Sequence, residues 1–327
     1  MSQQFTESDR AVLAQLIELQ VSKVEIARRL QKHRSSIHRE LARNSGPRGY
    51  LPVEAQQRAN ARRRLPRRTA KMSDPQIQKY VGQRLEHRWS PDQISGRSQR
   101  EFRREPERRI SRQTIYDWID RQRPDQRRTW RQCLRFGSPR RKRPENGGRL
   151  PHAAPIEGRP LVVDRRLRFG DWEGDTIVSR RRRGGLVSLV ERKSGYTLLA
   201  RVDDLRAATV RKASQRRLAS LPRHLLRTLT FDNGKEFAEH EALASATGMS
   251  IYFARPYCAW QRGTNENTNG LVRQYLPKGT DLTAESHRAV AALQSSLNDR
   301  PRKRLGYQTP HEVLAKNASR HGVAFEV

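Results

Sequence analysis

Hydrophobic residues in the first part of the chain recur at intervals of three and four positions, the spacing of helices with one buried face. This spacing predicts helices over 6–20, 23–30 and 36–43. Thr6 or Ser8 is expected to cap the first helix, because a short hydroxyl side chain can accept a free backbone N–H at a helix start. Two short helices joined by a tight turn predict a helix-turn-helix, which sets its second helix into the major groove of DNA. A plain three-helix bundle is the alternative.

The predicted helix over 36–43 would be the one that contacts DNA bases. Ser35 is expected to cap its start, and Ile37 and Leu41 are expected to face the core. In the helix before it, Val24 is expected to face inward, together with Ala27 and Leu30. The side chains expected to face DNA are Arg34, Ser35, Ser36, His38, Arg39 and Arg43.

A weaker version of the same pattern follows downstream. Ser90 opens a capped helix, and the segment 110–119 repeats the spacing of a recognition helix. Its inward side chains would be Ile115, Trp118 and Ile119, which leaves Arg112, Gln113 and Tyr116 for DNA. The insert over 97–109 is long for a helix-turn-helix, so this second unit is expected to be only helix-turn-helix-like.

From about 161 the pattern changes to short runs rich in Val, Ile, Leu and aromatic residues, which are typical of strands. Five strands are expected, over 172–178, 186–190, 196–202, 228–231 and 251–254. Helical periodicity is found over 207–220, 236–247, 264–275 and 286–298, and a capping box of Thr309 and Glu312 opens a last helix. The arginine-rich segment 180–185 is expected to be the hairpin tip between the first two strands. Three antiparallel strands followed by alternating helices and parallel strands make a mixed α/β sheet.

The charge of the chain indicates a polyanionic partner. Lys and Arg number 67 against 34 Asp and Glu, a formal charge of +33. Residues 1–150 hold 37 basic and 16 acidic residues, and residues 151–327 hold 30 and 18, so the excess is spread over the chain. Positive charges at this density repel one another, which favours contact with a phosphate backbone over a merely solvated charged face. The segments 60–71 and 121–149 are expected to be basic linkers.

Several classes of protein are excluded by composition. No apolar run approaches the ~20 residues that a membrane-spanning helix needs, and the first residues lack the pattern of a signal peptide. With only Cys133 and Cys258, neither a disulfide scaffold nor a Cys-based zinc finger is possible. A soluble, intracellular protein is therefore expected.

Three carboxylates in the predicted α/β part are candidates for metal ligation. Asp175 lies within the first strand, Asp232 ends the fourth strand, and Glu266 opens a helix whose first turns are rich in Asn and Thr, which are weak helix formers. Such a local conflict is typical of a functional site. Carboxylates at these positions can converge on one edge of the sheet, and hard oxygen ligands suit Mg²⁺ or Mn²⁺.

Each carboxylate also has a simpler interpretation. The Asp232-Asn-Gly sequence is often only a turn, and a single strand aspartate is often a hydrogen-bonded structural residue. Asp171 and Glu173 share a strand face with Asp175, so alternation cannot choose among the three. Arg273 lies two helical turns after Glu266 on the same face, where it would contact a phosphate or simply neutralise the carboxylates.

The motifs around these residues resemble the IS-thirty (IS30) family of bacterial insertion-sequence transposases. The similar segments read GDWEGDT at 170–176, TFDNGKEF at 230–237, WQRGTNENTNGLVRQYLPKG at 260–279 and LGYQTP at 305–310. The resemblance covers essentially the whole chain and implies an RNase H-like, integrase-like catalytic core with an Asp-Asp-Glu triad of Asp175, Asp232 and Glu266. It also implies the choice of Asp175 in the first strand, and the 33 residues between Asp232 and Glu266 are typical of the family.

The resemblance implies a DNA transposase that binds the terminal inverted repeats of its element and performs metal-dependent strand cleavage and transfer into target DNA. Two divalent ions, Mg²⁺ with Mn²⁺ as a substitute, would activate the attacking oxygen and stabilise the leaving oxygen. A homodimer or larger assembly on double-stranded DNA is expected, in the cytoplasm of a bacterium and associated with the nucleoid. The alternatives are a non-catalytic DNA-binding regulator and an RNase H-fold nuclease.

The expected organisation has helical DNA-binding parts before an α/β core. The expected divisions are a helix-turn-helix domain over 1–58, a basic linker over 59–86, a second helix-turn-helix-like unit over 87–122, a basic linker over 123–157 and the catalytic domain over 158–327.

Overall fold

The structure, a computed structural model, describes residues 4–64, 70–134, 150–180, 183–255 and 258–320. Its contacts divide the chain into two compact units, Met1–Ala70 and Lys71–Val327. Across the described ranges, every helix is too short or too polar to span a lipid bilayer.

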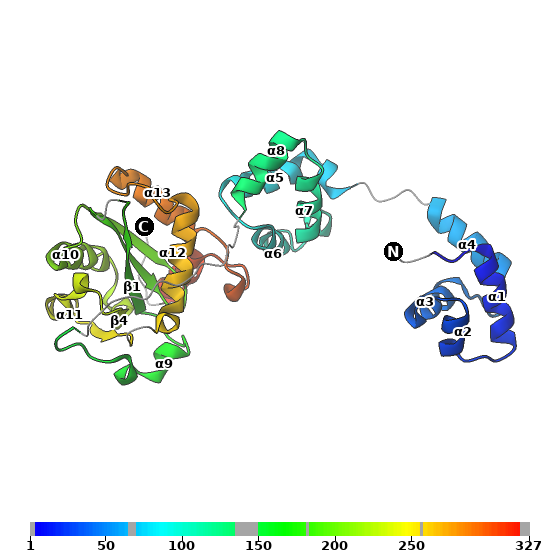
Figure 1. Cartoon of the computed structure of the whole chain (residues 1–327), viewed down its shortest axis with the longest axis horizontal. Helices are drawn as coiled ribbons and strands as arrows, with labels where there is room; N and C mark the ends of the chain where they lie inside the picture. Colours follow the sequence, from blue (N-terminus) through cyan, green and yellow to red (C-terminus); the bar gives the residue numbers. More distant parts are fainter. Residues whose placement is uncertain (1–3, 65–69, 135–149, 181–182, 256–257, 321–327) are drawn as a thin grey trace. The chain divides into compact units, whose positions relative to one another are not determined.

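The first unit consists of four helices (Figure 1). They are α1 (Glu7–Glu18), α2 (Lys23–Arg29), α3 (Arg34–Asn44) and α4 (Pro52–Arg64). Thr6 caps α1 in a reciprocal capping box with Asp9. His33 caps α3 in place of the predicted Ser35, because α3 begins at Arg34 and the His33 ring accepts the Ser35 N–H.

The inward prediction for Val24 is wrong. Its side chain is 58% exposed, whereas Ile26 is fully buried and Ala27 is nearly so. Residues two positions apart point to nearly opposite sides of a helix, so Val24 and Ile26 cannot both face the core.

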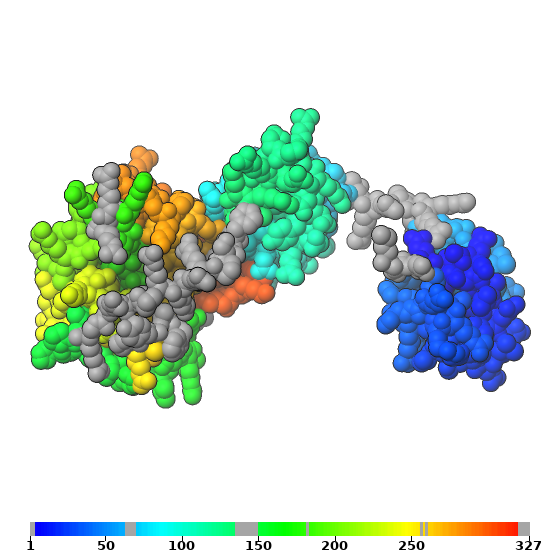
Figure 2. Space-filling model, viewed as in Figure 1, coloured from blue at the N-terminus to red at the C-terminus, as the bar shows by residue number. Residues whose placement is uncertain are grey.

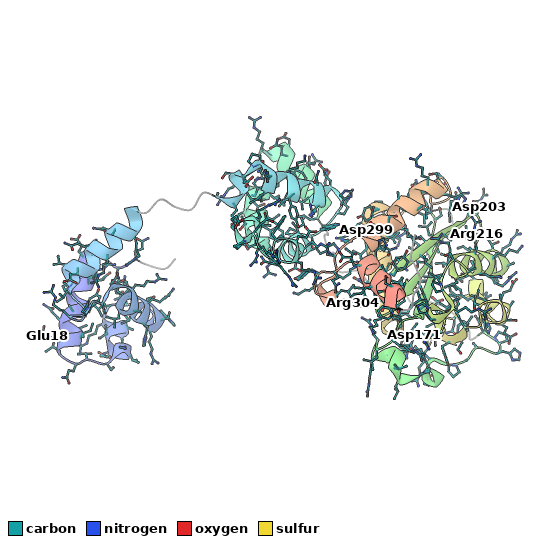
Figure 3. All side chains as sticks on the ribbon, turned by 180° about the vertical axis from the view of Figure 1, so that it is seen from behind. Glu18, Asp171, Asp203, Arg216, Asp299 and Arg304 are labelled. Carbon is teal, nitrogen blue, oxygen red and sulfur yellow. The ribbon has the colours of Figure 1, made fainter. Side chains whose placement is uncertain are left out.

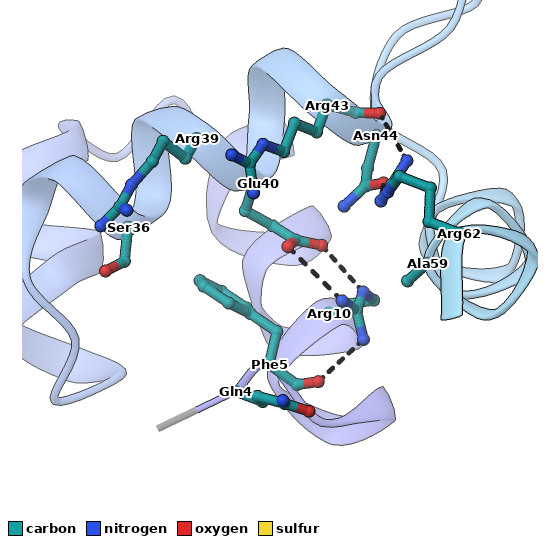
Figure 4. Close-up of a pocket in the computed structure, with 10 residues that line it drawn as sticks. All are labelled: Gln4, Phe5, Arg10, Ser36, Arg39, Glu40, Arg43, Asn44, Ala59 and Arg62. Carbon is teal, nitrogen blue, oxygen red and sulfur yellow. Dashed lines mark hydrogen bonds and ion pairs between the residues drawn. The ribbon is translucent and has the colours of Figure 1, made fainter. Parts of the chain in front are cut away.

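A buried ion pair stabilises this unit. The Arg10 Nε donates to Glu40 at 2.8 Å, and Tyr50 donates to the same carboxylate at 3.1 Å. Figure 4 shows this pair beneath α3. Helix α4 extends to Arg64, into the segment that was expected to be a linker, and the Arg62 side chain donates to the Arg43 carbonyl.

The second unit begins with four helices. They are α5 (Pro75–Glu86), α6 (Pro91–Glu101), α7 (Arg112–Asp120) and α8 (Pro124–Cys133). Ser90 caps α6 as predicted, and Ile115 and Ile119 of α7 are buried. Trp118 packs against Trp130 of α8 with ring centroids 5.6 Å apart, so α8 belongs to this helical part. Of the expected linker over 123–157, residues 135–149 lie outside the described residues.

A mixed five-stranded sheet forms the centre of the α/β part (Figure 1). Its strands are β1 (Asp171–Val178), β2 (Gly185–Glu191), β3 (Thr197–Val202), β4 (Thr228–Phe231) and β5 (Ser250–Phe253), in the order β3-β2-β1-β4-β5. The first three pair antiparallel, and β1, β4 and β5 pair parallel. This confirms the predicted mixed α/β sheet of five strands after helical units. Part of the predicted hairpin tip, 181–182, lies outside the described residues.

Helices cover both faces of the sheet. The helices are α9 (Leu161–Asp164), α10 (Ala207–Leu218), α11 (His240–Thr247), α12 (Gly263–Tyr275), α13 (His287–Asn298) and α14 (Pro310–Arg320). Short 3-10 helices lie at Lys71–Ser73, Pro106–Arg108, Ile156–Gly158, Arg223–Leu225, Lys235–Phe237, Ala259–Arg262 and Lys303–Leu305. Trp172 and Phe231 lie in the core under α10 and α11, whereas Ile177 packs with α12 and α13 on the other face. Strand residues of odd number in β1 therefore face α12.

The helical part packs on the C-terminal segment of the α/β part. Arg97 of α6 forms hydrogen bonds of 2.8 and 2.6 Å with the two oxygens of Glu312. Gly96 lies against Tyr307, and a Cβ there would be 2.4 Å from the ring. Figure 2 shows this contact between the sea-green helices and the orange-red segment, and Figure 3 labels Asp299 and Arg304 near it. The capping box of Thr309 with Glu312 is confirmed.

Candidate active site and nucleic-acid interfaces

Two of the three acidic side chains on the α12-facing side of β1 are buried with partners of their own. Asp171 is 1% exposed, pairs with Arg168 at 3.0 Å and accepts the Thr228 hydroxyl at 2.8 Å. Glu173 is equally buried and pairs with Arg192 at 2.9 Å. Figure 3 labels Asp171 at the start of the strand. Both carboxylates therefore have their charge compensated inside the protein.

Asp175 has a different environment, because it faces a second carboxylate. Its side chain is 22% exposed, and that of Asp232, just after β4, is 25% exposed. The guanidinium of Arg262 joins the two, with Nη1 3.6 Å from Asp175 Oδ1 and Nη2 2.9 Å from Asp232 Oδ2. Arg262 Nη1 also donates to the Gly174 carbonyl at 3.2 Å. One buried cation thus holds the two carboxylates together.

The electrostatics of Asp175 reflect this crowding. Burial raises the pKa of Asp175 to about 7, Arg262 opposes the rise, and the neighbouring Asp232 and Glu236 increase it. The Glu236 carboxylate also accepts the Thr176 hydroxyl at 2.9 Å. A negative charge at Asp175 is therefore costly, and a cation placed among these oxygens would relieve the cost.

Glu266 lies on α12 between two residues that contact Asp175. Arg262 is four positions before it, and Asn269, three positions after it, donates to Asp175 Oδ2 at 2.8 Å. Residues three apart lie on neighbouring turns of a helix, so Glu266 lies within one turn of a residue that contacts Asp175. Its side chain is exposed.

No group of three His, Cys, Asp or Glu side chains within the described ranges is close enough together to hold a metal ion. The donors at this edge nevertheless suit a hard divalent cation, because the carboxylates of Asp175 and Asp232 already share one cationic group, Arg262. Glu266 supplies a further exposed carboxylate on the adjacent helix face.

Arg273 lies further along the same face of α12. Its guanidinium donates to the carbonyls of Val178 at 2.9 Å and Pro277 at 3.3 Å. The side chain therefore joins the second half of α12 to the end of β1.

The predicted DNA-facing side chains of α3 lie at the surface. Arg34, Ser35, His38, Arg39 and Arg43 are exposed and Ser36 is half-buried. Arg39 and Arg43, with Arg62 of α4, line a depression of about 300 Å³ beside the Arg10–Glu40 pair (Figure 4). This concentrates arginine side chains along one side of α3.

On α7, the side chains of Arg112, Gln113 and Tyr116 are exposed as predicted. Gln113 Nε2 donates to Asp117 one turn later at 2.8 Å. The three side chains therefore reach the surface of α7, whereas Ile115 and Ile119 are buried.

The sequence interpretation missed Arg262, Asn269 and Glu236. Asn269 lies one helical turn after Glu266, and that spacing is a signal that could have identified it, whereas Arg262 lies just before α12 as its N-cap residue. Glu236 lies within the short 3-10 helix Lys235–Phe237 after Asp232, and the pattern of residues did not indicate the geometry of that helix.

Sequence comparison finds relatives that match most of the chain. A protein of Bacteroides fragilis named as the transposase for insertion sequence element IS4351 is 35% identical, over 99% of each chain. The transposase for insertion sequence element IS1086 of Cupriavidus metallidurans is 41% identical over 89% of this chain and 88% of its own. The transposase InsI for insertion sequence element IS30A of Escherichia coli is 36% identical over 90% of this chain and 79% of its own.

No family model matches the chain. Among solved structures, the catalytic core domain of BIV integrase is 22% identical and has a TM-score of 0.38, covering 46% of this chain and 98% of that domain.

Proposed function

The chain belongs to the IS30 family of insertion-sequence transposases, and we propose that Asp175, Asp232 and Glu266 form its catalytic triad for metal-dependent cleavage and transfer of DNA strands. Its substrate is DNA and its reaction is a transfer of polynucleotide ends. The net charge of +33 suits this substrate.

One observation carries the proposed triad. Arg262, four residues before Glu266, contacts both Asp175 and Asp232, and Asn269, three residues after Glu266, contacts Asp175. These contacts support convergence of the three carboxylates on one edge of the sheet. Asp171 and Glu173 are less suited as ligands, because arginines already compensate both of them.

Bound to the triad, two divalent ions would supply an activated oxygen nucleophile and stabilise the leaving oxygen of an in-line displacement, with Mg²⁺ preferred and Mn²⁺ as a substitute. The chain's own residues orient the ligands. Asn269 holds one oxygen of Asp175, and the Thr176 N–H holds the other at 2.9 Å. The Asp232 carboxylate is fixed by the Gly234 N–H at 3.2 Å.

We propose that the exposed faces of α3 and α7 bind the terminal inverted repeats. In this arrangement α3 reads bases with Ser36, His38 and Arg39, and α7 adds Arg112 and Gln113. Arg273 would contact a phosphate near the cleaved bond, since its guanidinium suits bidentate phosphate contact. Two element ends must be joined, so we infer at least a dimer on DNA.

Cleavage and joining assays on DNA that carries the element's own ends test the triad. Asp175→Asn, Asp232→Asn and Glu266→Gln should each abolish both reactions and leave end-binding within a few-fold, because metal ligation needs the charge and DNA recognition lies elsewhere. Asp171→Asn is the matched control and should keep measurable activity. Loss of activity in Asp171→Asn with retained activity in Asp175→Asn would move the ligand to Asp171.

The same assays separate the two alternative functions. Binding without any cleavage, in Mg²⁺ and in Mn²⁺, would indicate a DNA-binding regulator. Cleavage without joined products would indicate a nuclease of the same fold.

A further inference from the structure

We propose that Glu173 is a positioning residue, which fixes the start of the helix that carries Glu266. The proposal rests on the role of Glu266 in the proposed function. It concerns a carboxylate that is buried and does not belong to the triad.

Helix α12 begins without a cap of its own. Its N-cap residue is Arg262, and no side chain from the cap position accepts a backbone N–H. The first N–H groups of a helix have no partner within the helix, and the Asn- and Thr-rich sequence of these turns favours a helix only weakly. The start of α12 therefore depends on contacts from elsewhere in the fold.

Glu173 supplies such a contact from β1. Its Oε2 accepts the Asn265 N–H at 2.8 Å, across 92 positions of sequence. Asn265 is the third residue of α12, where a capping side chain normally acts. A hydrogen bond to a carboxylate at this position is charge-assisted, and the negative charge complements the positive end of the helix dipole. Glu173 therefore caps α12 from another element.

The capping carboxylate is itself buried and paired with an arginine. Glu173 is 1% exposed, and Arg192, whose side chain is 7% exposed, lies 2.9 Å from its other oxygen. The Arg192 N–H donates to the Asp171 carbonyl at 2.8 Å, so the arginine is fixed to the start of β1. Arg192 supplies the opposite charge that a buried carboxylate needs.

Through the Glu173 cap, strand β1 sets the position of two members of the proposed triad, Asp175 and Glu266. Asp175 lies two residues after Glu173 on the same face of β1, and Glu266 directly follows Asn265. A ligand set must be held within about 0.5 Å of its productive geometry, and a misplacement of about 1 Å can cost 10²-fold in rate. The Glu173–Asn265 bond directly links β1 to the residue next to Glu266.

Other contacts keep α12 attached when this bond is lost. The Ser188 hydroxyl lies 3.2 Å from Asn265 Oδ1 and 3.0 Å from Asn269 Oδ1, and Asn269 contacts Asp175. Loss of the Glu173 cap should therefore loosen the first turn of α12 and leave the helix in place.

Asp171 provides a matched control. It has the same burial, strand and face as Glu173 and an arginine partner, but its partners Arg168 and Thr228 lie outside α12. A purely structural role for Glu173 predicts similar behaviour of Glu173→Gln and Asp171→Asn. A positioning role predicts that only Glu173→Gln changes the amide exchange of α12.

The test is amide hydrogen exchange of the full chain without metal or DNA, followed by joining assays with Mg²⁺. Glu173→Gln keeps an oxygen that can accept the Asn265 N–H but removes its charge, so exchange of the first-turn amides of α12 should be about 10-fold faster. This variant should lower joining by about 10- to 100-fold with end-binding unchanged. Asp171→Asn should leave exchange in 263–275 as in the wild type.

Glu173→Asp is the second variant, for the case that the glutamine variant does not fold. It keeps the charge opposite Arg192 and retracts the carboxylate by one methylene, so the same faster exchange is expected. Unchanged exchange at the start of α12, an equal change in Asp171→Asn, or faster exchange with full joining activity would each overturn the proposal. Hydrogen exchange is measured without metal and does not depend on the triad. A Glu266→Gln variant that still joins DNA would therefore refute the triad without bearing on the exchange result.

Discussion

Replacing Arg262 with methionine removes the only cation that joins Asp175 and Asp232 among the contacts of the described residues. Methionine keeps much of the apolar stem, so packing is changed less than by alanine. The two carboxylates then face each other without compensation. Metal-free protein should lose stability, and divalent cations should restore it.

The size of the loss follows from burial. Removing one partner of a buried ion pair costs about 3–5 kcal/mol. Both aspartates are about a quarter exposed, so water offsets part of the cost, and about 1–3 kcal/mol is expected here. At about 2–4 °C per kcal/mol for a domain of this size, the metal-free Tm should fall by roughly 2–12 °C.

The assay is thermal unfolding of the full chain with and without Mn²⁺. At a concentration 100 times the Kd, a bound ion adds about 2.7 kcal/mol. In the wild type the ion must displace the guanidinium, so the Mn²⁺-dependent rise in Tm should be larger in Arg262→Met.

Arg159→Met is the control for this experiment. Arg159 is also buried and donates to Thr230 at 2.8 Å, but neither candidate aspartate is its partner. Its variant should lose stability without an enlarged response to Mn²⁺. A metal-free Arg262→Met protein as stable as the wild type, or one with the same Mn²⁺ response, would refute the reasoning.

Three further predictions concern DNA binding and the packing of the helical part. Arg39→Ala should reduce the preference for inverted-repeat DNA over random duplex in equilibrium binding, whereas Arg63→Ala, in the segment expected to be a basic linker, should weaken binding to both about equally. Equal losses for Arg39→Ala on the two DNAs would make Arg39 a phosphate contact only. Gly96→Leu should separate α6 from the α/β part and reduce strand joining at least 10-fold, while binding to the element ends is kept. The control is Gly82→Ala, which should be neutral because its new Cβ would lie 3.5 Å from its nearest neighbour. Full joining activity of Gly96→Leu would show that the packing is dispensable. Arg273→Ala should lower strand joining without weakening Mn²⁺ binding, and Arg273→Lys should recover part of the lost joining activity. Unfolding of the alanine variant would indicate a purely structural role.

Local patterns were sufficient to predict most of the secondary structure. Each of the five strands begins and ends within two residues of its predicted bounds, because a run of buried apolar residues between turns is visible without tertiary information. The capping boxes at Thr6 and Thr309 are local in the same sense, since both partners lie within three residues of each other.

Features that depend on distant partners were not predictable. The Arg97–Glu312 contact joins residues 215 positions apart, and an arginine in a basic chain gives no local sign of which carboxylate it will meet. The His33 cap was missed for a related reason, since Ser35 is the better capping residue by type and the observed start of α3 decides against it.

The acidic residues of β1 show where the limit lies for the candidate site. Alternation correctly places Asp171, Glu173 and Asp175 on one face of the strand, and it treats them as equivalent. Their partners make them different: Arg168 and Arg192 compensate the first two, whereas Asp175 shares Arg262 with another carboxylate. Since those arginines come from a loop, a strand end and a helix start, the distinction exists only after folding. A strand can therefore carry a proposed metal ligand and a helix cap two residues apart, and only the partner that each carboxylate meets separates the two roles.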